Sequence, residues 1–198
     1  MKVTIQTAKN YPMEQLVLPI KELIITGFEK KFIFNFFTKK ELSQIALTLS
    51  RVLSQNQKDN LIIAEKDGII CGCLYYITKS SAKIHLKSQD FSFLSFFKQL
   101  KLFNLLHLLS HKPKKDELYI DFIVVSPSFQ KQGIANKLLK QCKLLSLQQK
   151  ITLCVAGDNQ IAINLYKKEA FILKKRITSF TSKKIVGNKI WYFMEWSK

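Results

Sequence analysis

The sequence predicts an α/β fold in which a central sheet is covered by helices on both faces. From Glu117 to Trp196, segments with strand-like alternation and segments with helical periodicity follow one another. The chain has 198 residues, of which 47% are hydrophobic and 23% charged, enough for one domain with a buried core. We therefore expect a single domain over residues 1–198, with no linker dividing it.

The first part of the chain is predicted to form two helices and three strands. We expect a strand at Val3–Ala8, a helix at Met13–Thr26 that stops near Gly27, a helix at Lys40–Leu53, and strands at Leu61–Glu65 and Ile69–Thr78. The last two strands flank Asp67-Gly68, a dipeptide that favours a tight hairpin turn.

Residues 83–113 read as a helical insertion. Its segment Phe91–Leu109 is mainly apolar, and polar residues recur at every third position between Ser92 and His107. On a helix of 3.6 residues per turn such a stripe winds around the axis, so its two halves should face different neighbours. A helix packed on its own sheet explains this pattern. A substrate lid, a dimer contact and a membrane-surface helix remain alternatives.

The second part is predicted to alternate strand and helix. The expected elements are a strand at Leu118–Ser126, a helix at Gly133–Gln148, a strand at Ile151–Val155, a helix at Asp158–Glu169, and strands at Phe171–Phe180 and Asn188–Trp196. Alternation in the first strand puts Leu118, Ile120, Phe122 and Val124 on one face and Tyr119, Asp121, Ile123 and Val125 on the other. Asp121 is then a carboxylate in an apolar strand, either bonded to a neighbouring backbone group or lysine, or catalytic.

The net charge of +18 raises the question of a nucleic-acid partner. Only Arg51 and Arg176 are arginines, and the lysines are spread along the whole chain. This distribution favours a generally basic surface, which attracts polyphosphates, over a dedicated nucleic-acid face.

Cysteine and histidine patterns give no sign of a metal. Cys71, Cys73, Cys142 and Cys154 lie in apolar stretches without a CxxC pair, which indicates reduced core thiols. His107 and His111 are four residues apart but lack an intervening HExxH glutamate, so we expect surface or packing roles. The first residues do not resemble a signal peptide, and no uncharged stretch spans a bilayer, which predicts a cytoplasmic protein.

A short segment after the strand at 118–126 is typical of a phosphate site. Gln130-Lys131-Gln132-Gly133-Ile134-Ala135 leads into a helix whose first N–H groups have no helical partner. It resembles the pyrophosphate loop Gln/Arg-x-x-Gly-x-Gly/Ala of the GNAT N-acetyltransferase superfamily. A second segment, Asn159 to Phe171, is similar to that family's later motif Asn-x-x-Ala-x-x-Leu-Tyr-x-x-x-Gly-Phe.

The resemblance covers Leu61–Trp196, and residues 1–60 fit as the usual opening strand and two helices. It implies a GNAT-like mixed, mostly antiparallel central sheet with helices on both faces. The insertion resembles that of a bacterial subgroup with unassigned acceptors. Ala170 stands where the family usually has a glycine in a left-handed helix cap, a difference that bears on stability.

The resemblance also implies direct acetyl transfer from acetyl-CoA, as co-substrate, to an amine, without a metal. The backbone amides of Gln130, Lys131, Gln132, Gly133, Ile134, Ala135 and Asn136 would bind the pyrophosphate, and Ile123, Val124, Val125, Asn159, Ala162 and Tyr166 would contact the pantetheine arm. Tyr166 would donate a proton to the departing thiolate.

The sequence offers several candidates for the group that accepts the amine's proton. Asp121 is the first candidate base and Tyr119 the second, with Glu117 or a chain of waters as further alternatives. The acceptor and the oligomeric state, a homodimer included, also stay open. Rival functions are a CoA-binding sensor or scaffold without turnover, a basic nucleic-acid-binding protein, and a membrane-surface protein acting through residues 91–109.

Overall fold

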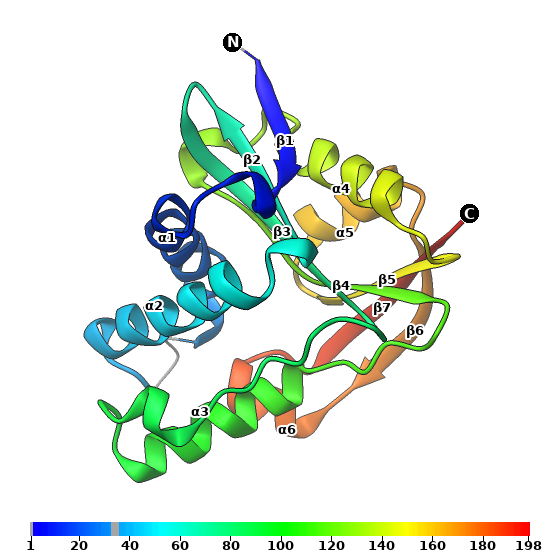
Figure 1. Cartoon of the computed structure of the whole chain (residues 1–198). Coiled ribbons are helices and arrows are strands. Elements are labelled where there is room, and N and C mark those ends of the chain that lie inside the picture. Colours follow the sequence, from blue (N-terminus) through cyan, green and yellow to red (C-terminus); the bar gives the residue numbers. More distant parts are fainter. Residues whose placement is uncertain (1, 33–35) are drawn as a thin grey trace.

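The computed structural model describes residues 2–32 and 36–198 and is built on a seven-stranded sheet (Figure 1). The strand order is β1-β2-β3-β4-β5-β7-β6. The strands are β1 (Val3–Thr7), β2 (Leu61–Lys66), β3 (Ile69–Thr78), β4 (Glu117–Val125), β5 (Lys150–Ala156), β6 (Ile172–Thr178) and β7 (Ile190–Ser197). Neighbouring strands are antiparallel except β4 and β5, which are parallel. The predicted mixed, mostly antiparallel sheet is confirmed.

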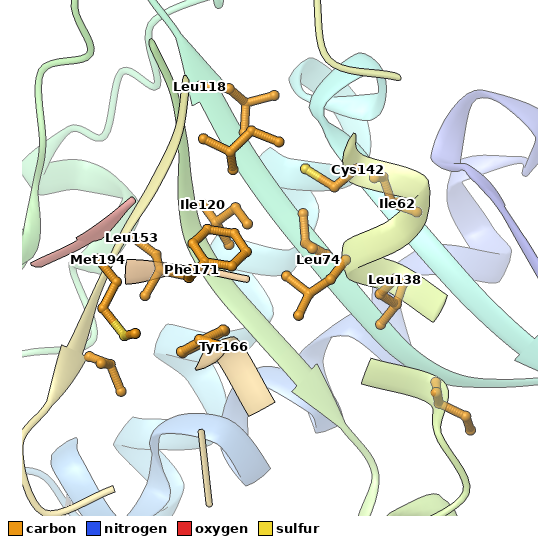
Figure 2. Packing of buried hydrophobic residues seen from close by; sticks show 14 of the residues in the cluster. Ile62, Leu74, Leu118, Ile120, Leu138, Cys142, Leu153, Tyr166, Phe171 and Met194 are labelled. Atoms are coloured by element: carbon orange, nitrogen blue, oxygen red, sulfur yellow. The ribbon is translucent and has the colours of Figure 1, made fainter. Parts of the chain in front are cut away.

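Helices cover both faces of this sheet. They are α1 (Met13–Phe32), α2 (Lys39–Asn56), α3 (Phe96–Leu109), α4 (Ile134–Leu145), α5 (Gln160–Lys168) and α6 (Phe180–Val186), with short 3-10 helices η1 (Ala8–Asn10), η2 (Lys58–Asn60), η3 (Ser88–Phe91) and η4 (Pro127–Phe129). Helix α1 packs on β3 and β4 from one side, and α4 packs on β1 to β4 from the other. Figure 2 shows the core beneath α4 and α5, where Leu138, Tyr166 and Phe171 meet Ile120 and Leu153.

The Asp67-Gly68 turn joins β2 and β3 as the sequence predicts. Asp67 has φ +54° and Gly68 has φ +77°. Positive φ at both central residues is the geometry that matches the twist of a two-residue hairpin.

The predicted end of the first helix near Gly27 is wrong, because α1 continues to Phe32. A Cβ atom built on Gly27 would lie 2.5 Å from Cγ2 of Val124 in β4. The glycine therefore permits a close approach of α1 to β4, and it marks a helix–strand contact, not a helix end.

The predicted alternation along β4 is also wrong beyond Ile120. Tyr75 of β3 pairs with Phe122 and Tyr76 pairs with Ile120, so Asp121 is an extra residue that forms a β-bulge. The bulge reverses the alternation. Ile123 and Val125 join Leu118 and Ile120 in the core under α4 and α5, whereas Phe122 and Val124 pack on the α1 side.

The insertion packs on another helix more than on the sheet. Helix α3 begins at Phe96, later than predicted, because Phe91 ends η3 and Ser95 is the N-cap residue. Its buried residues join Ile45 and Leu42 of α2, and at its C-terminal end the cluster reaches Trp191 of β7. The expectation of a helix packed on the sheet is thus met only at that end.

The segment after β6 contains a helix that periodicity did not predict. The strand expected at Phe171–Phe180 ends at Thr178, and α6 follows, with the Ser179 hydroxyl accepting a hydrogen bond from the Ser182 amide at 3.0 Å. Apart from Phe180, the helix lies between the two predicted strands, where the sequence analysis expected no element, because seven residues are too few to show a clear helical period.

All four cysteines are free thiols, and three of them are buried. Burial raises the pKa of both Cys73 and Cys142 to about 12, so these thiols stay protonated at neutral pH. The core role predicted for them is confirmed for Cys71, Cys73 and Cys142, whereas Cys154 is half-buried.

Ala170 adopts the left-handed conformation that the sequence comparison implied, with φ +62°. The Phe171 amide donates to the Tyr166 carbonyl at 2.9 Å, and the two rings lie 5.9 Å apart. This hydrogen bond and this side-chain contact are those of a Schellman cap, and they fix the end of α5 that carries Tyr166.

We predict that Ala170→Gly stabilises the protein by about 1 kcal/mol, because glycine adopts positive φ without the steric cost of a Cβ atom. For a chain of this size the melting temperature should rise by about 2–4 °C. Ala46→Gly, the same change in the interior of α2, should lower it. A lower melting temperature for Ala170→Gly would show that the cap is not strained.

Candidate active site

The parallel strands β4 and β5 separate partway along their length. Their pairing runs from Glu117 with Lys150 to Ile120 with Leu153. Beyond that point β4 stays paired with β3 up to Val125, while β5 stays paired with β7 up to Ala156. One edge of β4 is therefore unpaired from Asp121 onward within the described part of the chain.

The unpaired edge presents the backbone of Ile123 and Val125. The Ser126 amide donates to the Cys71 carbonyl at 2.8 Å, so Ser126 faces β3. Because successive residues of a strand direct their N–H and C=O groups to opposite sides, Ile123 and Val125 direct theirs toward the gap beside β5. Val124 points its backbone to β3 and its side chain to α1. An extended chain carrying amide groups could pair with this edge.

The turn between β4 and α4 contains a row of backbone amides without hydrogen-bond acceptors in the described part of the chain. Lys131 has φ +61° and Gly133, the N-cap residue of α4, has φ +75°. No described residue accepts a hydrogen bond from the backbone N–H groups of Lys131 to Asn136, and no side chain caps α4. Successive free amides at a helix N-terminus bind anions, with the helix dipole adding to the attraction.

Two residues whose backbone amides were predicted to belong to this row, Gln130 and Asn136, make further hydrogen bonds. The Gln130 amide donates to the Pro127 carbonyl at 3.3 Å, and its side chain donates to the Val125 carbonyl at 3.0 Å. The Asn136 side chain donates to Glu169 Oε1 at 2.9 Å, which ties α4 to the end of α5. Gln130 therefore shapes the turn, and Asn136 offers its backbone amide.

The space in front of the turn suits a phosphate group. A Cβ atom on Gly133 would meet nothing within 4 Å, so the backbone is open to a ligand. Lys66, from the end of β2, donates to Gln132 Oε1 at 2.8 Å and lies 6.0 Å from the Phe129 ring centroid. The sequence analysis missed Lys66, because nothing local connects the β2–β3 hairpin with a turn so distant in the chain.

Helix α5 contributes from the opposite side of the gap. Asn159 is its N-cap residue, and its side-chain oxygen accepts from the Ala162 amide at 3.2 Å, which leaves the amide NH2 group for a ligand. Tyr166 lies further along the helix and is buried in the core beside Phe171 (Figure 2). Burial raises the pKa of the Tyr166 phenol, which therefore stays protonated.

The structure brings the candidate catalytic residues together. Burial raises the pKa of Tyr119, and the charges of Cys154, Asp121 and Glu117 and the nearby Tyr166 raise it further. Asp121 likewise adds to the effect of burial in raising the pKa of Tyr75. Tyr119 thus lies within electrostatic range of both Asp121 and Tyr166, near the point where β4 and β5 begin to separate.

Asp121 is the titratable group best suited to accept a proton. The bulge places it at the start of the unpaired edge, and the residue as a whole is exposed. Protein atoms nevertheless crowd the carboxylate, and the loss of hydration raises its pKa to about 6.

Glu117 is engaged in a structural network. Burial would raise its pKa, but hydrogen bonds from the Thr152 hydroxyl and the Lys114 amide, together with His111, lower it below its ordinary value. His111 Nε2 lies 2.8 Å from Glu117 Oε1, and its ring stacks on Tyr119 with centroids 4.2 Å apart. This network joins the end of the insertion to β4, so His111 has the packing role predicted for it.

The sequence profile of the Acetyltransferase (GNAT) family matches residues 28–171. This match includes the unpaired edge of β4, the amide row and α5. The chain belongs to the GNAT acetyltransferase family. It is thus an acetyltransferase of the kind that uses a coenzyme A thioester, and the amide row and the β4 edge fit the pyrophosphate and the amide-containing arm of that coenzyme.

Solved structures share the fold over nearly their whole length. An N-acetyltransferase from Staphylococcus aureus is 18% identical, with 98% of this chain and 100% of that chain covered and a TM-score of 0.68. A GNAT-family acetyltransferase from Streptococcus pneumoniae is 16% identical, covers 99% of each chain and has a TM-score of 0.56.

A third similar structure contains coenzyme A. It is the NatC complex bound to Gag peptide and CoA, which is 15% identical over 100% of this chain and 99% of that chain, with a TM-score of 0.61. No curated protein matches the sequence. At these identities the neighbours establish the fold.

Neither a membrane span nor a metal cluster is found in the described parts of the chain. Across residues 2–32 and 36–198, each helix is too short or too polar to cross a bilayer. Over the same ranges, His, Cys, Asp and Glu side chains do not gather in groups of three that could hold a metal ion.

Proposed function

We propose that the protein transfers an acetyl group from acetyl-CoA to an amine by direct attack within a ternary complex. The observation that carries this proposal is the continuity of three features along one path: the free amides of Lys131–Asn136, the unpaired edge at Ile123 and Val125, and the buried phenol of Tyr166. Coenzyme A has a pyrophosphate, an arm with amide groups and a thiol in that order.

The binding steps use the backbone. The amides of Lys131–Asn136 bind the pyrophosphate, and Lys66 adds a positive charge beside Gln132. Ile123 and Val125 pair with the arm as an additional strand would, and Asn159 and Ala162 border it from α5. One of the free N–H groups of β4 then stabilises the oxygen of the tetrahedral intermediate.

The chemical steps require one proton acceptor and one donor. Asp121 accepts the proton of the attacking amine, because its raised pKa brings it closer to neutral pH than an ordinary carboxylate. Tyr119 has a raised pKa and remains protonated, which suits it to donate a hydrogen bond and not to act as the base. Tyr166 donates its proton to the departing thiolate.

We predict that Gly133→Val weakens coenzyme A binding by at least about tenfold, because the new side chain occupies the space where the amides meet the pyrophosphate. Isothermal titration with coenzyme A measures this. Gly187→Val is the matched control, since Gly187 also has positive φ, +76°, and open space around it. Unchanged affinity in Gly133→Val would refute the placement of the phosphate site.

We predict that Tyr166→Phe lowers kcat about tenfold to a hundredfold and changes coenzyme A affinity little, because only the proton for the thiolate is lost. A thiol-release assay with a panel of amines measures turnover. Tyr76→Phe, which removes a surface hydroxyl that donates to the Asp59 carbonyl at 3.1 Å, should be neutral. Coenzyme A binding without thiol release from any amine would instead support a sensor or scaffold.

We predict that Asp121→Asn lowers kcat/KM about a hundredfold and removes an acid limb near pH 6 from the pH profile. The same variant should be more stable than the parent at neutral pH. The carboxylate titrates near 3.8 when unfolded and near 6 when folded, so its ionised form destabilises the native state.

The stability difference has a defined pH dependence. It should be absent below about pH 4, grow as the pH rises to about 6, and stay constant above that value. Melting temperatures across this range measure it, with Asp116→Asn, a surface carboxylate paired with Lys150 at 3.3 Å, as control. A pH profile unchanged by Asp121→Asn would remove Asp121 as the base.

A further inference from the structure

The first turns of α3 expose a cluster of apolar side chains. Phe96 is 73% exposed, Phe97 74% and Leu100 51%. These positions share one face of the helix, and the two phenylalanine rings touch with centroids 5.8 Å apart. We call these three residues the α3 tip. Single exposed apolar residues are common, but a cluster on one helix face usually meets a partner.

Two lysines lie at the start of α2, which contacts the first turn of α3. Lys98, in the first turn of α3, forms an ion pair with Glu41 at 2.7 Å. Glu41 is also bonded to the Thr38 amide at 2.8 Å, so the start of α2 lies against α3. Lys39 and Lys40 are exposed at this start.

Two further lysines lie on the other sides. Ser88 donates its hydroxyl hydrogen to Gln99 of α3, which places the exposed Lys87 beside the second turn of the helix. Lys101 is exposed on α3 itself, with its ammonium 4.5 Å from the Phe36 ring centroid. The nearby carboxylate of Asp90 accepts a hydrogen bond from the Lys87 amide at 2.7 Å.

We propose that the α3 tip docks on an anionic lipid surface. Lys39, Lys40, Lys87, Lys98 and Lys101 outnumber the carboxylates of Glu41 and Asp90 here, so the apolar cluster is set in positive charge. An anionic bilayer offers negative headgroups to the lysines and an apolar interior to the phenylalanines, and the two attractions add. Helix α3 also lies along the outer border of the molecule, away from α4 and α5 (Figure 1).

The other candidate partners fit less well. A second copy of this chain, with a net charge of +18, would bring a second set of lysines against the first. A nucleic acid would match the lysines but would leave Leu100 without an apolar partner, and arginine, which stacks on bases, is missing from this surface.

The test is co-sedimentation of the full chain with vesicles at low and at physiological salt. Vesicles of phosphatidylcholine with about one-third phosphatidylserine should bind the protein, and vesicles of phosphatidylcholine alone should bind it weakly. The double variant Phe96→Ser/Phe97→Ser should lose at least about tenfold in binding. Lys39→Gln/Lys40→Gln should lose binding to the anionic vesicles and reduce its salt dependence.

The control is Leu147→Ser, which removes an apolar side chain that is 91% exposed near the end of α4 and should leave vesicle binding unchanged. Because the substituted side chains are exposed, melting temperature and acetyl transfer in solution should be the same in all variants. Failure of the parent protein to bind anionic vesicles overturns the proposal. Binding of Phe96→Ser/Phe97→Ser to anionic vesicles as strong as that of the parent protein also overturns it. So does a dimer or an RNA complex that the parent protein forms and that is lost in Phe96→Ser/Phe97→Ser but not in the other variants.

Discussion

The two central strands of the sheet, β4 and β5, are paired along only part of their length. The pairing of β4 with β5 ends at Ile120 and Leu153. Beyond that point β4 remains paired with β3, and β5 remains paired with β7. The edge of β4 beyond this point bears the backbone N–H groups of Ile123 and Val125 and the carbonyl of Ile123, while the Val125 carbonyl accepts a hydrogen bond from the Gln130 side chain. Unpaired backbone groups are costly away from water and are satisfied by any extended chain of amides that lies along them. We infer from this constraint that an extended ligand pairs with this edge through backbone groups, whatever the side chains around it.

The rest of the active site follows from this separation. The bulge at Asp121 lies where β4 leaves β5, and it places a carboxylate of raised pKa there. The same strand ends in the turn that leads to Gly133 and the free amides of α4. Helix α5 then follows β5, and its Schellman cap holds Tyr166 against Phe171. In the proposed function, consecutive parts of the chain therefore bind the amide-containing arm, the pyrophosphate and the thiol end of one cofactor.

The sequence predicted the features whose causes are local. The hairpin at Asp67-Gly68, the turn at Gln130–Ala135 and the positive φ of Ala170 depend on residues a few positions apart. The bulge at Asp121 could not be predicted, because it depends on the register with β3. Gly27 looked like a helix end because its contact with Val124 is distant in sequence. Lys66 was missed for the same reason, since it lies 66 residues from Gln132. The pairing of His111 with Glu117, only six residues apart, was missed because periodicity does not report how the chain turns between α3 and β4.

Hydrogen–deuterium exchange on addition of coenzyme A tests the central claim most directly, since it reports on backbone amides one segment at a time. The amides of Ile123 and Val125 and those of Lys131–Asn136 should exchange more slowly with the coenzyme than without it, while those of β1 and β6 should be unchanged. Protection confined to other segments, or no protection at saturating coenzyme, would show that the cofactor does not lie between β4 and β5.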